Sequence, residues 1–110
     1  MSKNHLGEFE EIVMLTVGIL ANDAYGFSII EEIEKRLNRS VSIGSLQVVL
    51  KRLEKKGYLS SHLGEASQVR GGKRKRYFML TNLGVNILTE AKEQRLGLWN
   101  ALPETVIAKS

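Results

Sequence analysis

Residues 42–57 read SIGSLQVVLKRLEKKG, and this stretch decides the fold. Its apolar residues recur at spacings of three and four, which places them along one face of a helix. Ser42 is a favourable N-cap, and Gly57 stands where many helices end in a left-handed glycine. The stretch therefore predicts a helix from about residue 43 to residue 56, with an inner stripe formed by Leu46, Val49, Leu50 and Leu53.

The outer face of this predicted helix is polar and basic. It offers hydroxyl, amide and guanidinium groups that hydrogen-bond base edges or phosphates, and amines that suit phosphates. It also offers Val48, an apolar residue suited to a thymine methyl group. We therefore expect this helix to lie in the major groove of DNA. The candidate contact residues on it are Ser42, Ser45, Gln47, Val48, Lys51, Arg52 and Lys55.

Charge is distributed unevenly along the 110 residues. Residues 41–80 hold nine Lys or Arg and two acidic residues, whereas the rest of the chain holds seven basic and ten acidic residues. The formal net charge of +4 is therefore concentrated in the middle of the chain. A local basic region of this kind is typical of a surface that binds a phosphate backbone.

A glycine-containing basic run follows the predicted helix. It lies between two apolar segments, residues 58–63 and 77–80, which we expect to pair as strands. The connection between them is long for a hairpin, and long loops usually have a function. We expect this wing to lie along the DNA backbone or to enter the minor groove. Its candidate contact residues are Arg70, Lys73, Arg74, Lys75 and Arg76.

Two further helices are predicted before residue 42. Residues 6–21 are apolar around most of a helix, which indicates burial on more than one side and a second chain packed against it. Residues 25–37 form the next helix, with Asp23 as its expected N-cap. The expected inner face of that helix consists of Phe27, Ile30, Ile33 and Leu37.

A last helix is predicted between Thr81, a favourable N-cap, and Pro103, which should stop it. Gly84 is expected to weaken its first turn. The resulting order, α-α-α-β-β-α, is that of a mainly α (α+β) winged helix-turn-helix. We assign residues 1–80 to the DNA-binding domain, residues 81–103 to a C-terminal dimerisation helix, and residues 104–110 to a frayed, disordered tail.

The chain resembles the PadR-like bacterial transcriptional regulators over nearly its whole length. The strongest parts of the resemblance are the Arg-Leu-Glu-Lys-x-Gly core at residues 52–57 and the Arg-Gly-Gly wing at residues 70–72. The segments that carry it read LGEFEE (6–11), DAYG (23–26), VSIGSL (41–46), LKRLEKKGYLSS (50–61), RGGKRKRYF (70–78) and LT (80–81), with Gly84 nearby.

The resemblance implies a homodimer joined by the first and last helices, with one recognition helix and one wing on each half-site of double-stranded DNA. It also implies repression of transcription, and the short form of the family with a single C-terminal helix. One departure concerns specificity: the family usually has tyrosine after the leucine that matches Leu46, and this chain has Gln47. Glutamine can contact phosphate or an adenine edge, so the operator type stays open.

Trp99 is the only tryptophan and lies on the last predicted helix. We favour a role in dimer packing, because aromatic residues are enriched at interfaces. The sharper hypothesis, supported by the resemblance to short family members, is an apolar pocket for a small lipophilic effector. The residues assigned to the dimer interface and effector pocket are Phe9, Val13, Leu88, Trp99 and Leu102.

Other function classes find little support in the sequence. There is no cysteine, His5 and His62 are too far apart to suggest a metal site, and no nucleotide-binding loop occurs. We therefore expect no enzyme activity, metal or cofactor. No signal peptide is predicted, the longest apolar stretch is too short to cross a bilayer, and a cytoplasmic location is expected. The alternative to a specific regulator is a winged-helix module that binds protein or RNA.

Overall fold

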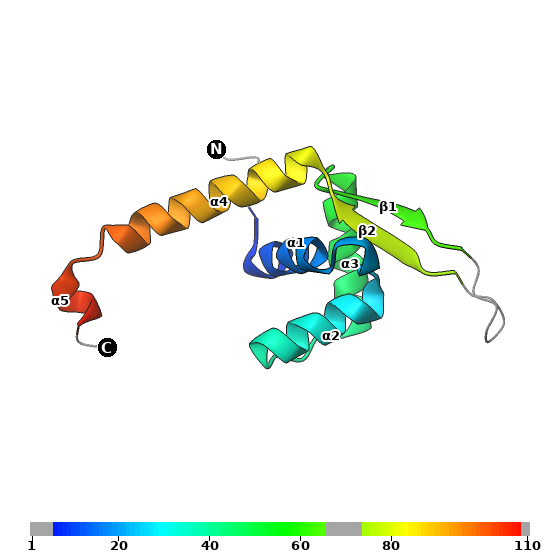
Figure 1. The fold of residues 1–110 in the computed structure, drawn as a ribbon, viewed down its shortest axis with the longest axis horizontal. Helices are drawn as coiled ribbons and strands as arrows, with labels where there is room; N and C mark the ends of the chain where they lie inside the picture. Colours follow the sequence, from blue (N-terminus) through cyan, green and yellow to red (C-terminus); the bar gives the residue numbers. More distant parts are fainter. Residues whose placement is uncertain (1–5, 66–73, 109–110) are drawn as a thin grey trace.

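The computed structural model describes residues 6–65 and 74–108 and confirms the predicted winged helix-turn-helix class. Three helices come first and are followed by a hairpin and a long helix (Figure 1). The elements are α1 (Glu8–Leu20), the short 3-10 helix η1 (Ala21–Asp23), α2 (Gly26–Leu37), α3 (Ile43–Lys55), β1 (Leu59–Leu63), β2 (Arg76–Leu80), α4 (Asn82–Asn100) and α5 (Glu104–Ile107).

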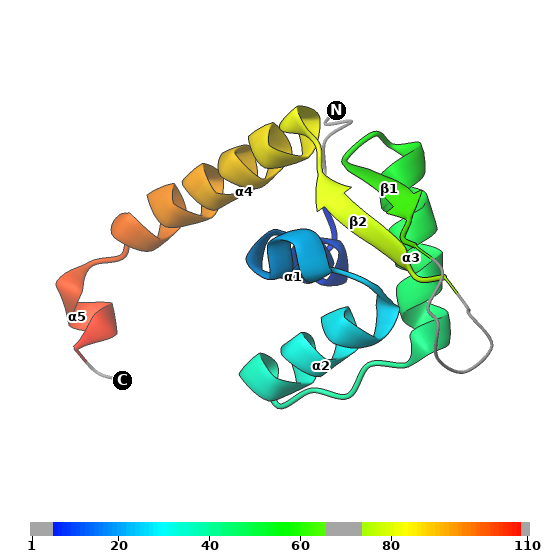
Figure 2. The same ribbon diagram turned by 45° about the vertical axis from the view of Figure 1, so that its right-hand side comes forward.

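The first three helices and the hairpin form the body of the molecule, and α4 projects away from it (Figures 1 and 2). α1 contacts α2, α3, β2 and α4, so it is the central element of the described structure. α4 begins against α1 and β2 and then extends beyond the body towards α5. Among residues 6–65 and 74–108, nothing covers the apolar surface of its second half.

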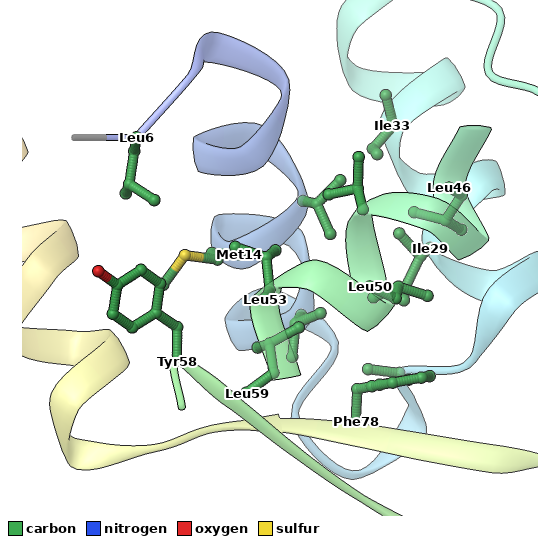
Figure 3. Close-up of a cluster of buried hydrophobic side chains, with 14 of the residues drawn as sticks. Leu6, Met14, Ile29, Ile33, Leu46, Leu50, Leu53, Tyr58, Leu59 and Phe78 are labelled. Atoms are coloured by element: carbon green, nitrogen blue, oxygen red, sulfur yellow. The ribbon is translucent and has the colours of Figure 1, made fainter. Parts of the chain in front are cut away.

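The core forms where α1, α2 and α3 meet the hairpin (Figure 3). All four predicted inner residues of α3 are buried, as are Met14, Tyr58, Leu59 and Phe78. Burying one large apolar side chain stabilises a fold by about 1.5–3 kcal/mol. The stripe of α3 is therefore a main source of stability, and its burial fixes which side of α3 faces solvent.

The predicted inner face of α2 is partly wrong. Phe27 is 68% exposed and Leu37 is 49% exposed, whereas Ile29 and Ile33 are buried. α2 packs against both α1 and α3, and the side of α2 that makes these contacts carries Ile29 and Ile33. Since apolar residues occupy several sides of α2, periodicity did not identify the correct face.

The start of α2 also differs from the expectation. Asp23 lies in η1, and Tyr25 is the N-cap residue of α2. The Ser28 hydroxyl accepts a hydrogen bond from the Tyr25 N–H (2.9 Å) and donates one to the Asp23 carbonyl (2.6 Å). A serine inside the first turn thus satisfies the backbone that the Asp23 side chain was expected to cap.

The hairpin is antiparallel, with Leu59 opposite Leu80 and Leu63 opposite Arg76. The Phe78 N–H donates to the Ala24 carbonyl at 2.8 Å, which ties β2 to the segment before α2. The Thr81 N–H donates to the Tyr58 carbonyl at 3.1 Å, and the Thr81 hydroxyl accepts the Gly84 N–H as predicted for an N-cap. The Phe78 bond holds the hairpin beside the start of α2, and the two Thr81 bonds hold the start of α4 against the turn after α3.

The C-terminal end was predicted to be frayed, and this is wrong for residues 104–107, which form α5 after Pro103. Pro103 is the N-cap residue of α5, with α4 already ended at Asn100. A proline that stops one helix is also favourable at the start of the next, where its missing N–H costs nothing.

In the ranges 6–65 and 74–108, no helix combines the length and apolarity needed to cross a membrane.

Gly84 was expected only to weaken α4, but it is required by packing. A Cβ atom at this position would lie 2.2 Å from the Tyr58 carbonyl oxygen, a contact with backbone that cannot rotate away. Glycine therefore allows α4 to start close against the end of α3 and the first strand.

We expect Gly84→Ala to lower the free energy of unfolding by about 1–3 kcal/mol, the usual cost of overpacking. Gly97→Ala in the same helix is the matched control, since nothing lies within 4 Å of its added Cβ, and it should raise stability by up to about 1 kcal/mol. Urea unfolding followed by circular dichroism measures both. Equal stability of the two variants would contradict the close approach at Gly84.

Candidate nucleic-acid interface

The solvent-facing side of α3 lies opposite its buried stripe. Gly44, Val48, Lys51 and Lys55 occupy its centre, and all four are exposed. Val48 is 58% exposed although it is apolar. Among the described residues, no carboxylate forms an ion pair with Lys51 or Lys55. The centre of this face thus combines an apolar contact point with two cations.

Gln47 lies on the side of α3 that faces the wing. Its amide nitrogen is 3.6 Å from the position that a Cβ of Gly26 would occupy. Gln47 also lines a hollow of about 270 Å³ together with Phe27 at the start of α2 and with Arg74 and Lys75 of the wing. This location places Gln47 at the edge of the exposed face, next to cations that suit phosphates.

The two serines of the predicted set act first on the helix itself. The Ser42 hydroxyl accepts the Ser45 N–H at 3.1 Å, which confirms Ser42 as the N-cap of α3. The two hydroxyl oxygens lie 2.6 Å apart. Their role in DNA contact stays a prediction, because in this structure each hydroxyl is engaged by the other.

Arg52 is on the opposite flank of α3, turned towards α1. Its Nη1 lies 3.6 Å from Oε2 of Glu10, a buried carboxylate of α1. Lys56 Nζ approaches the same oxygen at 3.2 Å. Burial raises the pKa of Glu10, but the Gly7 N–H, Lys56 and Arg52 outweigh it and hold that pKa below its ordinary value. Arg52 therefore differs from Lys51 and Lys55 in having an internal counter-ion.

Three of the predicted wing residues lie in the described part of the chain, and Arg70 and Lys73 lie outside it. Arg74 Nε donates to the Gly64 carbonyl at 2.8 Å, and Arg76 Nη1 donates to the Ser61 hydroxyl at 3.0 Å. Both side chains and Lys75 belong to exposed residues. Residues 74–76, here called the root of the wing, thus present three cations on the same side as Gln47.

An aromatic cluster at the wing root was missed in the sequence. The rings of Tyr25 and Tyr77 meet edge to face with centroids 5.7 Å apart, and His62 stacks on Tyr77 at 5.8 Å. Lys75 Nζ lies 4.1 Å from the centroid of the Tyr25 ring. The pairing of His62 with Tyr77 follows from the strand register, whereas the contact of Tyr25 depends on the fold. The cluster orients the wing relative to α2 and α3.

A second surface feature lies between α1 and α4. It is an open, mostly apolar groove of about 720 Å³, and one ion pair crosses it, from Arg95 Nη1 to Glu11 Oε1 at 2.9 Å. The only tryptophan is 59% exposed on its wall. The lining residues are Glu11, Leu15, Leu80, Val85, Leu88, Thr89, Lys92, Arg95, Leu96 and Trp99.

The groove brings together only some of the residues assigned to the dimer and effector surface. Leu88 and Trp99 line it, and Leu102 is exposed but lies outside it. Val13 has no exposed surface, so its assignment to an interface is wrong: it belongs to the core. Phe9 packs against the core under Arg39, whose guanidinium carbon is 5.5 Å from the ring centroid.

Leu15 and Ile19 are the exposed apolar residues of α1 that sequence reasoning did not assign to this surface. Periodicity places them on a helix that is apolar on most sides, so it cannot separate them from Val13.

Within residues 6–65 and 74–108, no cluster of three or more His, Asp or Glu residues is arranged to hold a metal ion.

Known proteins place the chain in one family. The model of the transcriptional regulator PadR-like family matches residues 15–90. An uncharacterised protein from Lysinibacillus sphaericus is 40% identical over 86 residues, covering 76% of this chain and 74% of that protein. A PadR-like transcription factor from Bacteroides fragilis is 29% identical with a TM-score of 0.70, covering 93% of this chain and 89% of that one.

A solved PadR family transcription regulator from Clostridium difficile R20291 has the same TM-score of 0.70 at 21% identity, covering 89% of this chain and 98% of that chain. At this identity the likeness concerns the fold alone. The family match over residues 15–90 extends the agreement to the sequence itself. The chain therefore belongs to the PadR-like family of transcriptional regulators and is a DNA-binding regulator, not an enzyme.

Proposed function

We propose that this protein is a dimeric repressor that binds a palindromic operator in the cytoplasm and is released by a small lipophilic ligand. The observation that carries the proposal is the pairing of two surfaces. One is the exposed, cationic side of α3 beside the wing root, and the other is the uncovered apolar side of α1 and α4. The first surface suits DNA, and the second suits another copy of the chain.

In this proposal α3 enters the major groove. Lys51 and Lys55 contact phosphates, and Val48 contacts the C5-methyl group of a thymine. Gln47, at the edge of the exposed face, contacts a phosphate or an adenine edge. Ser42, Ser45 and Arg52 lie at the flanks, where the phosphate strands border the groove.

The wing supplies the second contact in this proposal. Arg74, Lys75 and Arg76 lie beside Gln47 around the hollow at the start of α2. Arg70 and Lys73 belong to the same basic run. Arginine is favoured in a narrow minor groove because the negative potential is strongest there, so the wing would follow the backbone or enter that groove.

The dimer is proposed to form through α1 and α4. Leu15 of α1 and Leu96 and Trp99 of α4 are exposed apolar residues that line the groove. Leu98 of α4 is 75% exposed. Apolar exposure on this scale commonly marks an interface. A twofold dimer presents two recognition helices related by symmetry, which predicts an operator with two inverted half-sites about one helical turn apart.

A lipophilic ligand is proposed to occupy the groove next to Trp99. Because the groove shares α1 with the body of the domain, a ligand there can change how the two copies are spaced, and with it the distance between recognition helices. Repression follows if the bound dimer covers a promoter. Since the chain has one tryptophan, its fluorescence reports directly on the groove.

The first experiment is fluorescence anisotropy with duplexes from upstream of the protein's own gene, compared with a shuffled duplex at low and moderate salt. We expect a preference of about a hundredfold or more that survives moderate salt, since specific affinities exceed non-specific ones by 10³ or more in typical regulators. Equal, weak binding that collapses with salt would contradict a specific operator. That outcome would favour the winged-helix module that binds protein or RNA.

We expect Lys55→Gln to weaken binding to all duplexes and to reduce the salt slope by about one, as for a lost phosphate contact. Lys35→Gln is the matched control, because it removes the same charge from an α2 residue that pairs with Glu32. Anisotropy titrations over a salt series measure both. An unchanged slope for Lys55→Gln would place this residue outside the DNA contact.

We expect Trp99→Glu to shift the protein towards the monomer, because a charge would be buried against apolar groups of the second copy. Asn86→Glu introduces the same charge on α4 at an exposed position that does not line the groove, and it should leave assembly unchanged. Sedimentation velocity distinguishes the two. An intact dimer in Trp99→Glu would move the interface away from this groove.

A further inference from the structure

Glu10 is a buried carboxylate between α1 and the C-terminal half of α3. Its side chain is 10% exposed. Oε1 accepts the Gly7 N–H at 2.9 Å, which stabilises the first turn of α1. Oε2 faces the other way and lies 3.2 Å from Lys56 Nζ and 3.6 Å from Arg52 Nη1. One carboxylate thus joins a helix start to two cations that are far away in the sequence.

The arrangement favours a charged Glu10. The Gly7 N–H, Lys56 and Arg52 hold the pKa of this carboxyl below its ordinary value despite the burial that raises it. Oε2 therefore presents a negative charge to Arg52 and Lys56. A carboxylate and a phosphate are both anions that accept charge-assisted hydrogen bonds from arginine and lysine, so Glu10 competes with phosphate for these two cations.

The two cations are not enclosed by this contact. The side chain of Arg52 is 50% exposed and that of Lys56 is 36% exposed. Both lie on the flank of α3, beside the face that carries Lys51 and Lys55. They are therefore close enough to the proposed DNA surface to bind phosphate, but the single carboxylate of Glu10 already offsets part of their charge within the protein.

We propose that Glu10 is an internal counter-charge that withholds Arg52 and Lys56 from DNA phosphates and so limits binding to non-specific DNA. The inference rests on the proposed placement of α3 in the major groove. Phosphate contacts supply essentially all of non-specific affinity. Offsetting part of the charge of two of the four cations between Lys51 and Lys56 therefore lowers non-specific binding more than operator binding, which also includes base contacts.

The test is Glu10→Gln in the full chain, with binding to a shuffled duplex measured by anisotropy over a salt series. Glutamine keeps an oxygen that can accept the Gly7 N–H but removes the charge. We expect tighter binding and a salt slope steeper by about 0.9 for each released cation. The preference for operator over shuffled DNA should fall. Weaker binding or an unchanged slope would overturn the inference.

Two controls separate a local release of cations from a change in net charge. Glu93→Gln removes the same charge from an exposed residue of α4 that has no ion pair among the described residues, and it should leave the slope unchanged. In a protein that already carries Arg52→Gln and Lys56→Gln, the gain from Glu10→Gln should disappear. A gain that persists there would show that Glu10 does not act through these cations.

A second measurement does not depend on the folding of the Glu10 variant. In the otherwise native protein, Arg52→Gln should leave the slope for shuffled DNA nearly unchanged, whereas Lys55→Gln should reduce it. Equal reductions would overturn the inference while leaving DNA binding by α3 intact. Absence of DNA binding by the native protein at low salt would overturn both this inference and the proposed function.

Discussion

Burial of the α3 stripe is the constraint on which the other features depend. Leu46, Val49, Leu50 and Leu53 pack into the core formed with α1, α2 and the hairpin. Once these side chains point inward, helical periodicity fixes the direction of every other side chain of α3. Val48, Lys51 and Lys55 must face solvent, and Arg52 must face α1. The same packing that stabilises the domain thereby selects the side chains of the proposed DNA-binding face.

α1 connects the two proposed functional surfaces through adjacent carboxylates. Glu10 points towards α3 and its cations, and Glu11 points towards α4, where it meets Arg95 in the apolar groove. Neighbouring residues on a helix diverge by about 100° in direction, because one turn takes 3.6 residues. A single helix can therefore contact the recognition helix on one side and the proposed dimer surface on another.

Backbone contacts and aromatic rings place the wing. The Phe78 N–H binds the Ala24 carbonyl, and Tyr77 lies between Tyr25 and His62. Lys75 covers the Tyr25 ring. Because the root of the hairpin is held at the start of α2, the cations at that root lie beside Gln47 and the end of the exposed α3 face. The described cations of the wing thus adjoin the Gln47 side of α3.

The sequence by itself determined the order of elements, the inner stripe and caps of α3, and the concentration of charge in the middle of the chain. These features depend on residues close together in the chain, where helical periodicity and capping act. The bonds of Ser28 with Tyr25 and Asp23 at the start of α2 are also local, although they were missed in the sequence. Tertiary structure decided which side of α2 is buried and that Val13 is core. It also decided that Gly84 must lack a side chain and that Arg52 has a counter-ion. Each of these depends on atoms brought together from distant segments, so no local pattern could specify them.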